Sequence, residues 1–347
     1  MTVLSADVVG KVLNDRYEVL ALDREELLGS VYAGLDRQAG RRVAIKVLHP
    51  HLTEDASKFK RFGREITNTW MITQQNTVEV LDWGEDGDLH YLVMEFLRAH
   101  TLEEELKDGP MPVERAVRIA VQIARAIGAA HQEGIVHRAL APSNVLLLDN
   151  AVDGADFVKV RDFGLSKLEK VDDEDTGLTT QNTRVGNAEY MAPEYIKTST
   201  YHTKGDLYAL GALLYQMVAG KPPFTGPTLD VLQAHVGKDP DPLSKHAEGV
   251  PEWLDALVAG TLAKKPEERP GAYRIVQMLE TGMGSSLEPP ALYPLDVNGD
   301  FVVPTGPPRV AMALGVALLV GLGAALVMIG VIVLIAALFV LRSAGYV

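Results

Sequence analysis

The sequence predicts an α+β fold with two lobes, a small antiparallel β lobe that contains one helix and a larger helical lobe, followed by one C-terminal transmembrane helix. Three observations predict this class. β-Branched residues and turn signals dominate the chain up to residue 97, helical apolar periodicity dominates residues 98–281, and residues 310–341 carry no charged side chain.

The small lobe is expected to contain strands on both sides of one helix. Residues 17–35 and 41–48 have the β-branched and apolar composition of strands around turns. Apolar residues then recur every three or four positions over 57–72, which predicts a helix with one apolar face. Two further strands are expected at 77–82 and 89–96.

The large lobe is expected to be mainly helical. Its helices are predicted at 112–132, 206–219, 251–263 and 273–280. The first has Pro and Glu near its start, as helices often do. The second is apolar on nearly every side, as expected of a helix in the middle of a domain. A short hairpin is expected to join 145–148 to 157–160.

The stretch after the helical lobe contains repeated Pro, Gly, Ser and acidic residues without periodicity, which indicates a linker. The predicted organisation is therefore a lead-in, the small lobe, the large lobe, the linker, the transmembrane helix and a short tail. Their residues are 1–16, 17–97, 98–281, 282–309, 310–341 and 342–347.

The composition excludes several kinds of partner. The chain has 347 residues, a formal net charge of -13 and no cysteine. No nucleic-acid partner is expected, because phosphate backbones need a basic face. Without cysteine there is no disulfide framework and no thiolate metal site. No secretory signal pattern is visible among the first residues.

The apolar run at 310–341 is predicted to be a single membrane span. At about 1.5 Å per residue it is roughly 48 Å long, against a hydrocarbon core of about 30 Å, so the helix would tilt or extend beyond the core. We expect the lobes in the cytoplasm at the inner membrane, with residues 342–347 outside. Ala317, Gly321 and Ala325 share one helix face and permit a homodimer, although a span that does not associate fits them equally well.

Residues 137–144 read His-Arg-Ala-Leu-Ala-Pro-Ser-Asn, and an Asp-Phe-Gly begins at Asp162. A Val-Ala-Ile-Lys ends at Lys46, and an Ala-Pro-Glu ends at Glu194. This series resembles the protein kinases, in particular the bacterial Ser/Thr kinases of the eukaryotic-like type. The resemblance covers residues 17–280, about three-quarters of the chain, and implies the two-lobed protein-kinase-like fold.

The resemblance also implies that the catalytic centre is missing. In the family, the residue after His-Arg is an Asp that orients the substrate hydroxyl and accepts its proton, and a Lys two residues later steadies the transferred phosphate. This chain has Ala139 and Ala141 at these positions, so no catalytic residue is intact. Asn187 also replaces a Thr that contacts both groups, so the losses fall on groups that depend on one another.

Much of a nucleotide site is retained by the same resemblance. Lys46 would pair with the phosphates and with Glu65 of the predicted helix. Asn144 and Asp162 would hold Mg²⁺ through oxygen atoms. Apolar side chains would sandwich the base and backbone groups would bond its edge, although the apolar residues also fit plain core packing. These residues are Val31, Ala44, Leu146, Glu95 and Leu97.

The glycine-rich loop that covers the phosphates in the family is eroded. Its three-glycine pattern falls on residues 24–31, where only Gly29 remains. The glycines let the backbone approach the phosphates. Arg24 and Glu26 would obstruct that approach, Glu25 and Glu26 add negative charge, and Arg24 would offset it in part by folding inward. We expect ATP and Mg²⁺ to bind weakly or not at all.

Three further residues are expected to support the fold. In the family, Glu194 pairs with Arg269 in a buried ion pair, and Asp206 braces the catalytic loop. These contacts are architectural and say nothing about activity.

The segment at 165–186 corresponds to the activation loop of the kinases. It carries acidic residues at 172–175 and then three threonines, and Arg138 is retained, which in the family receives a phosphate from this loop. Phosphorylation by another, active kinase is one interpretation, and a solvated acidic loop with ordinary threonines is the other. The threonines are Thr179, Thr180 and Thr183.

We therefore expect a membrane-anchored pseudokinase that acts as a docking or allosteric partner of other signalling proteins. The alternative is a slow or unconventional Ser/Thr kinase that uses Lys46, Asn144 and Asp162 without the usual base. A structural membrane-bound module without nucleotide is a third interpretation. A positioned base contributes about 10²–10⁴-fold and kinases turn over at roughly 1–100 s⁻¹, so transfer is expected below about 10⁻² s⁻¹.

Overall fold

The computed structural model describes residues 8–26, 28–50, 72–152, 155–163, 188–285 and 287–292. The chain divides into two compact units, Met1–Phe301 and Val302–Val347, and all described residues lie in the first. Several predicted features lie outside the described residues and stay predictions. They are most of the helix at 57–72 with Glu65, the threonines Thr179, Thr180 and Thr183, Asn187, and the span at 310–341 with Ala317, Gly321 and Ala325.

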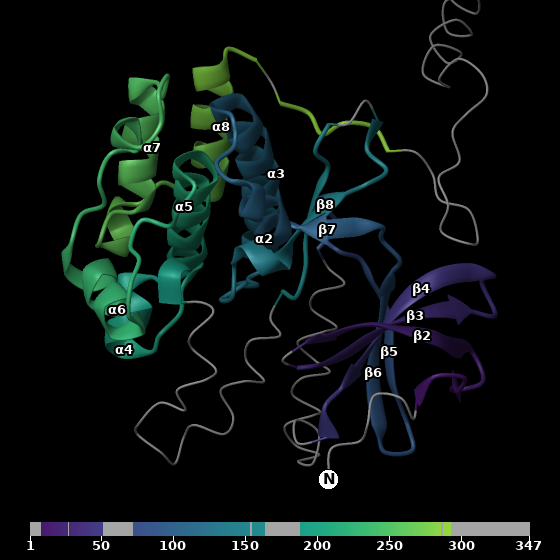
Figure 1. The fold of residues 1–347 in the computed structure, drawn as a ribbon. Coiled ribbons are helices and arrows are strands. Elements are labelled where there is room, and N and C mark those ends of the chain that lie inside the picture. Colours follow the sequence, from purple (N-terminus) through teal and green to yellow (C-terminus); the bar gives the residue numbers. More distant parts are fainter. Residues whose placement is uncertain are drawn as a thin grey trace, which may run out of the picture. The chain divides into compact units, whose positions relative to one another are not determined.

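The small lobe contains a six-stranded antiparallel sheet (Figure 1). Its strands are β1 (Val12–Leu13), β2 (Tyr17–Glu26), β3 (Gly29–Asp36), β4 (Arg41–Leu48), β5 (Val80–Asp86) and β6 (Leu89–Glu95). They lie in the order β1-β2-β3-β4-β6-β5. The stretch predicted as strand at 17–35 is thus a hairpin of two strands, and β5 begins three residues later than predicted, at Val80.

The two faces of this sheet have different surroundings. One face carries a hydrophobic core that includes Tyr17, Tyr32 and Ile45, each at most 2% exposed. Successive side chains of a strand point to opposite faces. Val31 and Lys46, which lie directly opposite each other on β3 and β4, therefore belong to the other face, which we call the site face.

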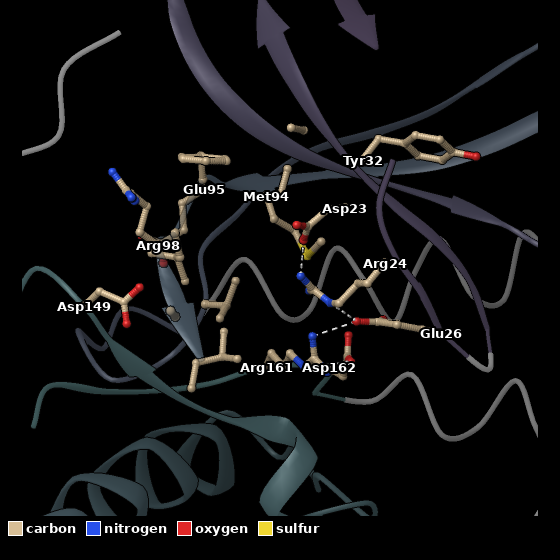
Figure 2. Close-up of a pocket in the computed structure, with 17 residues that line it drawn as sticks. Asp23, Arg24, Glu26, Tyr32, Met94, Glu95, Arg98, Asp149, Arg161 and Asp162 are labelled. Atoms are coloured by element: carbon tan, nitrogen blue, oxygen red, sulfur yellow. Dashed lines mark hydrogen bonds and ion pairs between the residues drawn. The ribbon is translucent and has the colours of Figure 1, made fainter. Parts of the chain in front are cut away.

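Strand β2 departs from regular pairing shortly before its end. Its register with β3 shifts twice within residues 19–24. Such bulges insert an extra residue and re-aim the side chains that follow. After the second bulge Arg24 lies opposite Val31, and opposite residues share a face. Arg24 and, two residues later, Glu26 therefore point to the same face as Lys46, as Figure 2 shows for Arg24 and Glu26.

The large lobe is helical and includes a second small sheet (Figure 1). Its helices are α2 (Leu102–Glu105), α3 (Val113–Gln132), α4 (Pro193–Thr198), α5 (Thr203–Ala219), α6 (Thr228–Gly237), α7 (Glu252–Thr261) and α8 (Ala272–Met283). Short 3-10 helices lie at Leu106–Asp108, Pro142–Asn144, Ala188–Tyr190, Leu243–Lys245 and Pro266–Glu268. The sheet joins β7 (Ala99–Thr101), β8 (Val145–Leu148) and β9 (Val158–Val160), so the predicted hairpin is confirmed as β8–β9.

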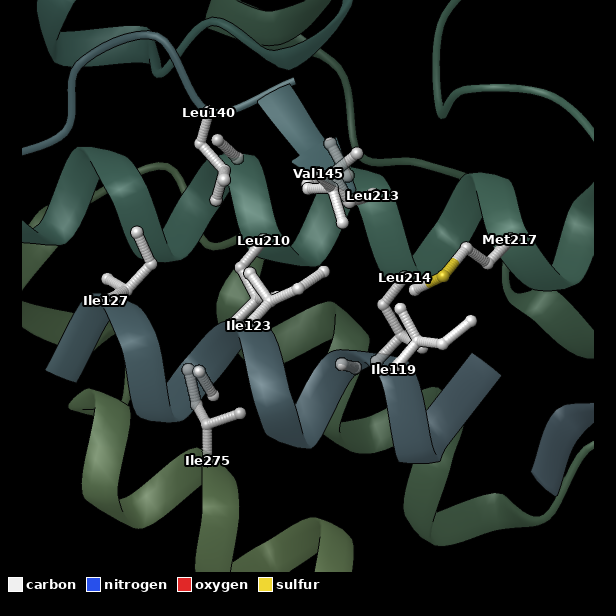
Figure 3. Close-up of a cluster of buried hydrophobic side chains, with 14 of the residues drawn as sticks. Ile119, Ile123, Ile127, Leu140, Val145, Leu210, Leu213, Leu214, Met217 and Ile275 are labelled. Atoms are coloured by element: carbon white, nitrogen blue, oxygen red, sulfur yellow. The ribbon is translucent and has the colours of Figure 1, made fainter. Parts of the chain in front are cut away.

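The core of the large lobe forms where α3 meets α5 (Figure 3). Ile119, Ile123 and Ile127 recur every four residues along α3 and lie beside Leu210 and Leu214 of α5. Residues four apart share one face of a helix, so this stripe forms one continuous contact. Helix α5 is buried on nearly every side, as predicted. The four helices predicted from periodicity correspond to α3, α5, α7 and α8.

The chain after α8 turns back along the lobe. Arg125 of α3 donates a hydrogen bond to the carbonyl oxygen of Leu287 at 2.8 Å, and the Val152 N–H donates to that of Ala291 at 2.8 Å. We call residues 287–292 the strap. The strap lies within the stretch predicted as a linker from residue 282. Its sequence has no periodicity, and single contacts rather than a regular element hold it in place.

In the part of the chain that the structure describes, no helix combines the length and the apolar character that crossing a membrane requires. The span predicted at 310–341 lies beyond that part.

Candidate functional site

A cavity of about 270 Å³ is lined by both lobes (Figure 2). Of the residues expected around a base, Ala44, Glu95, Leu97 and Leu146 line it. Asp162, expected to bind a metal, lines it as well. Figure 2 shows Glu95 on one side of the cavity and Asp162 with Glu26 on the other, so the cavity has a base end and an ionic end.

Three residues expected at the nucleotide do not line the cavity: Gly29, Val31 and Lys46. Val31 and Lys46 are each only 1% exposed. Gly29 has a packing role, because a Cβ at this position would lie 2.1 Å from the carbonyl oxygen of Val47 on β4. Only glycine permits that approach of two strands, so its presence does not depend on phosphates.

Lys46 is buried in a network of ion pairs. Its Nζ lies 2.8 Å from Oε2 of Glu26 and 3.0 Å from Oδ1 of Asp162. The other oxygen of Glu26, Oε1, accepts a hydrogen bond from Nη1 of Arg161 at 2.6 Å. The network therefore joins two cations to two carboxylates, and its side chains are between 2% and 15% exposed.

The charges within this network stabilise one another. Burial alone would raise the pKa of Glu26, but the charges of Lys46 and Arg161 outweigh burial and lower that pKa to about 2. Burial alone would lower the pKa of Lys46, but the carboxylates of Asp162 and Glu26 outweigh it, and the pKa is raised. Glu26 and Lys46 therefore both carry their charges at neutral pH.

Arg24 folds inward, as one of the sequence hypotheses supposed. Its Nε donates to Oε1 of Glu26 at 2.7 Å, and its Nη1 donates to Oδ2 of Asp23 at 2.5 Å (Figure 2). The Arg24 side chain is 41% exposed, so solvent weakens these ion pairs. The positive charge of Arg24 thus offsets the negative charges of Asp23 and Glu26 on its own strand.

The loop at 137–144 is held by Asp206 of α5. Oδ2 of Asp206 accepts the backbone N–H of His137 and Oδ1 accepts that of Arg138, both at 2.8 Å. The predicted role of Asp206 as a brace of this loop is confirmed. Arg138 has a φ of 71°, in the left-handed region that a non-glycine residue occupies only where its surroundings hold it.

His137 is completely buried and is oriented on both sides of its ring. Nε2 lies 3.0 Å from the carbonyl oxygen of Arg161, so Nε2 carries the proton, and Nδ1 accepts the N–H of Ala139 at 3.3 Å. Burial lowers the pKa of His137, which keeps the ring neutral. The ring of Phe163 packs against it with 4.7 Å between centroids. His137 thus ties the loop to residues 161–163.

Ala139 presents a methyl group where the resemblance places the proton acceptor. Its carbonyl oxygen accepts a hydrogen bond from Nδ2 of Asn144 at 2.8 Å, so the loop closes on itself without a carboxylate. Ala141 is 2% exposed and belongs to the hydrophobic core of the large lobe. The frame of the loop is complete, but the side chains at both positions have no group that accepts or donates a proton.

Asn144 and Asp162 have the atoms to hold Mg²⁺. Asn144 uses its Nδ2 for Ala139, so its Oδ1 is the atom that would face a cation. Mg²⁺ prefers oxygen ligands and is commonly held by one or two carboxylates together with substrate phosphates. Among the described residues, no group of three His, Cys, Asp or Glu side chains is placed to hold a metal ion. The pair therefore fits an ion that arrives with a nucleotide.

Sequence reasoning missed two members of the network, Glu26 as a partner of Lys46 and Arg161 as a partner of Glu26. The sequence signal for these ion pairs was Glu26 at a position where the resemblance places a glycine, together with Arg161 directly before Asp162. Their meeting depends on the two bulges in β2, which shift its pairing with β3 by two residues and place Glu26 opposite Gly29. A pattern of residue types does not predict bulges.

The model of the protein kinase domain family matches residues 27–279. The serine/threonine-protein kinase PknB of Mycobacterium leprae is 35% identical over 263 residues, which cover 74% of this chain and 41% of that protein. A probable serine/threonine-protein kinase of Clostridium perfringens is 33% identical over 264 residues, which cover 76% of this chain and 37% of that protein. The chain thus spans about two-fifths of the length of these relatives.

Among solved structures, the PknI kinase domain of Mycobacterium tuberculosis aligns with a TM-score of 0.60 at 23% sequence identity. The alignment covers 78% of this chain and 98% of that domain. This likeness confirms the predicted two-lobed fold.

Proposed function

This chain belongs to the protein kinase family, in its bacterial eukaryotic-like serine/threonine branch, and we propose that it is a pseudokinase. The observation that carries the proposal is the methyl group of Ala139 in a loop that Asp206 still braces through His137 and Arg138. Such a loop keeps its geometry while it lacks the group that takes the proton from a substrate hydroxyl. Its relatives are named as serine/threonine-protein kinases. This chain has the frame of such a kinase without the group that takes the proton.

The expected rate follows from the size of the missing contribution. A positioned general base contributes about 10²–10⁴-fold, and kinases turn over at roughly 1–100 s⁻¹. Ala141 stands where the family has a Lys, so the positive charge that steadies the transferred phosphate is missing as well. We expect phosphotransfer below about 10⁻² s⁻¹. When bound, Mg²⁺ supplies charge neutralisation for the phosphates, and Asn144 and Asp162 are the residues that would hold it.

A slow serine/threonine kinase is the second candidate. Lys46 and Asp162 lie 3.0 Å apart beside the cavity, and Asn144 is fixed on the loop by its bond to Ala139. Positioning and electrostatics carry much of phosphoryl transfer. This second candidate therefore predicts a slow phosphotransfer rate that still exceeds the uncatalysed background.

Restoring the missing carboxylate tests the proposal. Phosphotransfer from Mg-ATP to protein substrates is compared for the native chain, for Ala139→Asp and for Ala139→Asn, which matches Asp in size but accepts no proton. We expect the native rate below about 10⁻² s⁻¹ and Ala139→Asp at least about tenfold faster than Ala139→Asn. A native rate within the ordinary kinase range overturns the pseudokinase proposal. A slow native rate that Asp162→Asn abolishes favours the second candidate.

We also propose that residues 310–341 anchor the chain in the inner membrane as a single span, with both lobes in the cytoplasm. The absence of charge over this stretch supports the anchor, and the spacing of Ala317, Gly321 and Ala325 supports pairing of two copies. Deletion of 310–347 is expected to release the chain from carbonate-washed membranes. Gly321→Leu is expected to reduce cross-linked dimer, and Gly323→Leu, on another helix face, serves as its control.

We propose that this pseudokinase docks other signalling proteins, including an active kinase that phosphorylates Thr179, Thr180 or Thr183. The acidic run before these threonines and the retained Arg138 support a phosphorylated segment. Mass spectrometry of the chain from its native cells is expected to find phosphate on at least one of the three. Threonines that are always unmodified contradict this part of the proposal.

A further inference from the structure

We infer that the cavity takes a neutral nucleoside such as adenosine in preference to ATP, because Glu26 occupies the place at Lys46 where the phosphates of ATP would bind. The inference deepens the proposed function, on which it rests, by naming the class of ligand for the same site. It also assigns Glu26 a role as the residue that sets this preference.

The position of Glu26 is fixed by its own strand. Glu26 lies opposite Gly29 on the site face, two residues beyond Arg24, and its side chain spans from Lys46 to Arg161 with one carboxylate oxygen on each. Each of these oxygens lies within hydrogen-bond distance, at 2.8 Å and 2.6 Å. Glu26 therefore uses both oxygens and bridges two buried cations, which is the arrangement that a phosphate oxygen pair would adopt.

The charge of the network is already balanced. Among the described residues, Lys46, Arg161 and Arg24 contribute three positive charges, and Glu26, Asp162 and Asp23 contribute three negative charges. A network without Glu26 would carry a net positive charge and would attract an anion. With Glu26 in place, a triphosphate adds negative charge to a neutral and largely buried cluster, where charges interact more strongly than in water.

The base end of the cavity has no such obstacle. It is lined by Ala44, Met94, Leu97 and Leu146, which together present an apolar slot of the kind that holds a flat ring. Arg98 lies beside it on the connection between the lobes, as Figure 2 shows. A base at this end makes no contact that requires Glu26 to move, whereas a phosphate that takes the place of Glu26 at Lys46 must displace its carboxylate.

Calorimetric titration of the full chain with adenosine and with ATP, each with and without Mg²⁺, measures the preference directly. We expect the native chain to bind adenosine more tightly than ATP. Glu26→Gln keeps the shape of the side chain but removes its charge, and we expect it to strengthen ATP binding at least about tenfold and to change adenosine binding less than about threefold.

The control is Glu25→Gln, which removes the same charge from the neighbouring exposed residue. We expect it to leave the preference unchanged. ATP binding by the native chain as tight as adenosine binding overturns the inference, as does a failure of adenosine to bind at millimolar concentration. An equal effect of Glu26→Gln and Glu25→Gln on ATP also overturns it. The pseudokinase proposal is decided separately, by the phosphotransfer rate, so the two fail independently.

A second measurement does not depend on nucleoside binding. Glu26→Ala leaves Lys46 and Arg161 without their shared carboxylate, so millimolar tripolyphosphate is expected to raise its melting temperature more than that of the native chain, at ionic strength matched with sodium chloride. If Glu26→Ala does not fold, Glu26→Gln is measured in the same way. Equal shifts for variant and native chain overturn the inference.

Discussion

Arg269 and Glu194 form a two-point ion pair, with Nη1 to Oε1 and Nη2 to Oε2 both at 2.7 Å. The Arg269 side chain is completely buried, and that of Glu194 is 11% exposed. The pair predicted from the sequence is confirmed. It joins the first turn of α4 to the residues that precede α8, so it holds together two parts of the large lobe that lie far apart in the chain.

The costs of removing the two partners of this pair are expected not to be additive. Arg269→Met leaves the Glu194 carboxylate without its cation in a largely buried place, and we expect the free energy of unfolding to fall by about 3–5 kcal/mol. Arg269→Met combined with Glu194→Gln is expected to cost clearly less than the sum of the single changes. Urea denaturation measures all three variants, and additive costs would contradict the buried pair.

Gly29 is expected to be required for packing whether or not a nucleotide binds. Gly29→Ala places a Cβ 2.1 Å from the carbonyl oxygen of Val47, so β3 and β4 must separate, and we expect a loss of about 1–3 kcal/mol in the free energy of unfolding. Gly237→Ala is the matched control, because no atom lies within 4 Å of a Cβ there. We expect it to be neutral or slightly stabilising, and equal losses in the two variants would refute the packing role.

His235 is expected to make stability depend on pH below neutrality. Its ring is completely buried, and Nδ1 lies 2.7 Å from the hydroxyl oxygen of Tyr208. Burial, with the nearby charge of Lys264, lowers the pKa of His235 to about 4. Between pH 6.5 and 4 the unfolded chain takes up a proton at this ring that the folded chain refuses. The free energy of unfolding therefore falls as the pH falls through this window, by roughly 3 kcal/mol from this residue.

The variant His235→Gln isolates this contribution from that of the other titrating groups. It offers Tyr208 an acceptor that does not titrate, so the difference in unfolding free energy between native chain and variant is expected to shrink as the pH falls from 6.5 to 4. Chemical denaturation across that range measures the difference. A difference that stays constant with pH would exclude His235 as the source.

The strap is expected to depend on Arg125. This side chain donates to the Leu287 carbonyl oxygen and to Glu280, both at 2.8 Å. Arg125→Ala is expected to release the strap, so that the Val152 amide, which donates to Ala291, exchanges its hydrogen at least about tenfold faster. Arg274→Ala, an exposed position on α8, is the control. Unchanged exchange in Arg125→Ala would show that the strap is held by its other contacts.

Much of the fold was predictable, because its long elements carry strong periodicity. The stripe of Ile119, Ile123 and Ile127 predicts α3 without further information, and the all-round apolar character of 206–219 predicts a buried helix. The short elements β1, β7, α2, α4 and α6 were missed. A two-residue strand or a single turn of helix has too few residues to show a period, and its structure is decided by the neighbours on which it packs. Helix α6 has ten residues but buries only Val231, Ala234 and His235, so its sequence shows no wide apolar face.

Sequence reasoning predicted the parts of the site that depend on which residue stands at a position. It did not predict the parts that depend on where a side chain lies. The methyl group of Ala139 and the brace from Asp206 follow from the motifs alone. The place that Glu26 reaches does not, because the two bulges in β2 shift its position along β3 by two residues and the sequence does not predict bulges. The sequence hypothesis treated Glu26 as a charge that repels phosphates, whereas the structure places it in an ion pair with Lys46.

Leu292 of the strap packs against the apolar cluster of Leu148, Ala151 and Phe157, and Leu97 packs against the same cluster while it also lines the cavity. Leu97 therefore contacts both the cavity and the cluster on which the strap packs. Thermodynamic reciprocity then applies to them: whatever free energy a ligand in the cavity adds to or removes from strap docking, a docked strap adds to or removes from the affinity of that ligand. A change in strap docking and a change in the affinity of a ligand in the cavity would be two readings of one coupling free energy.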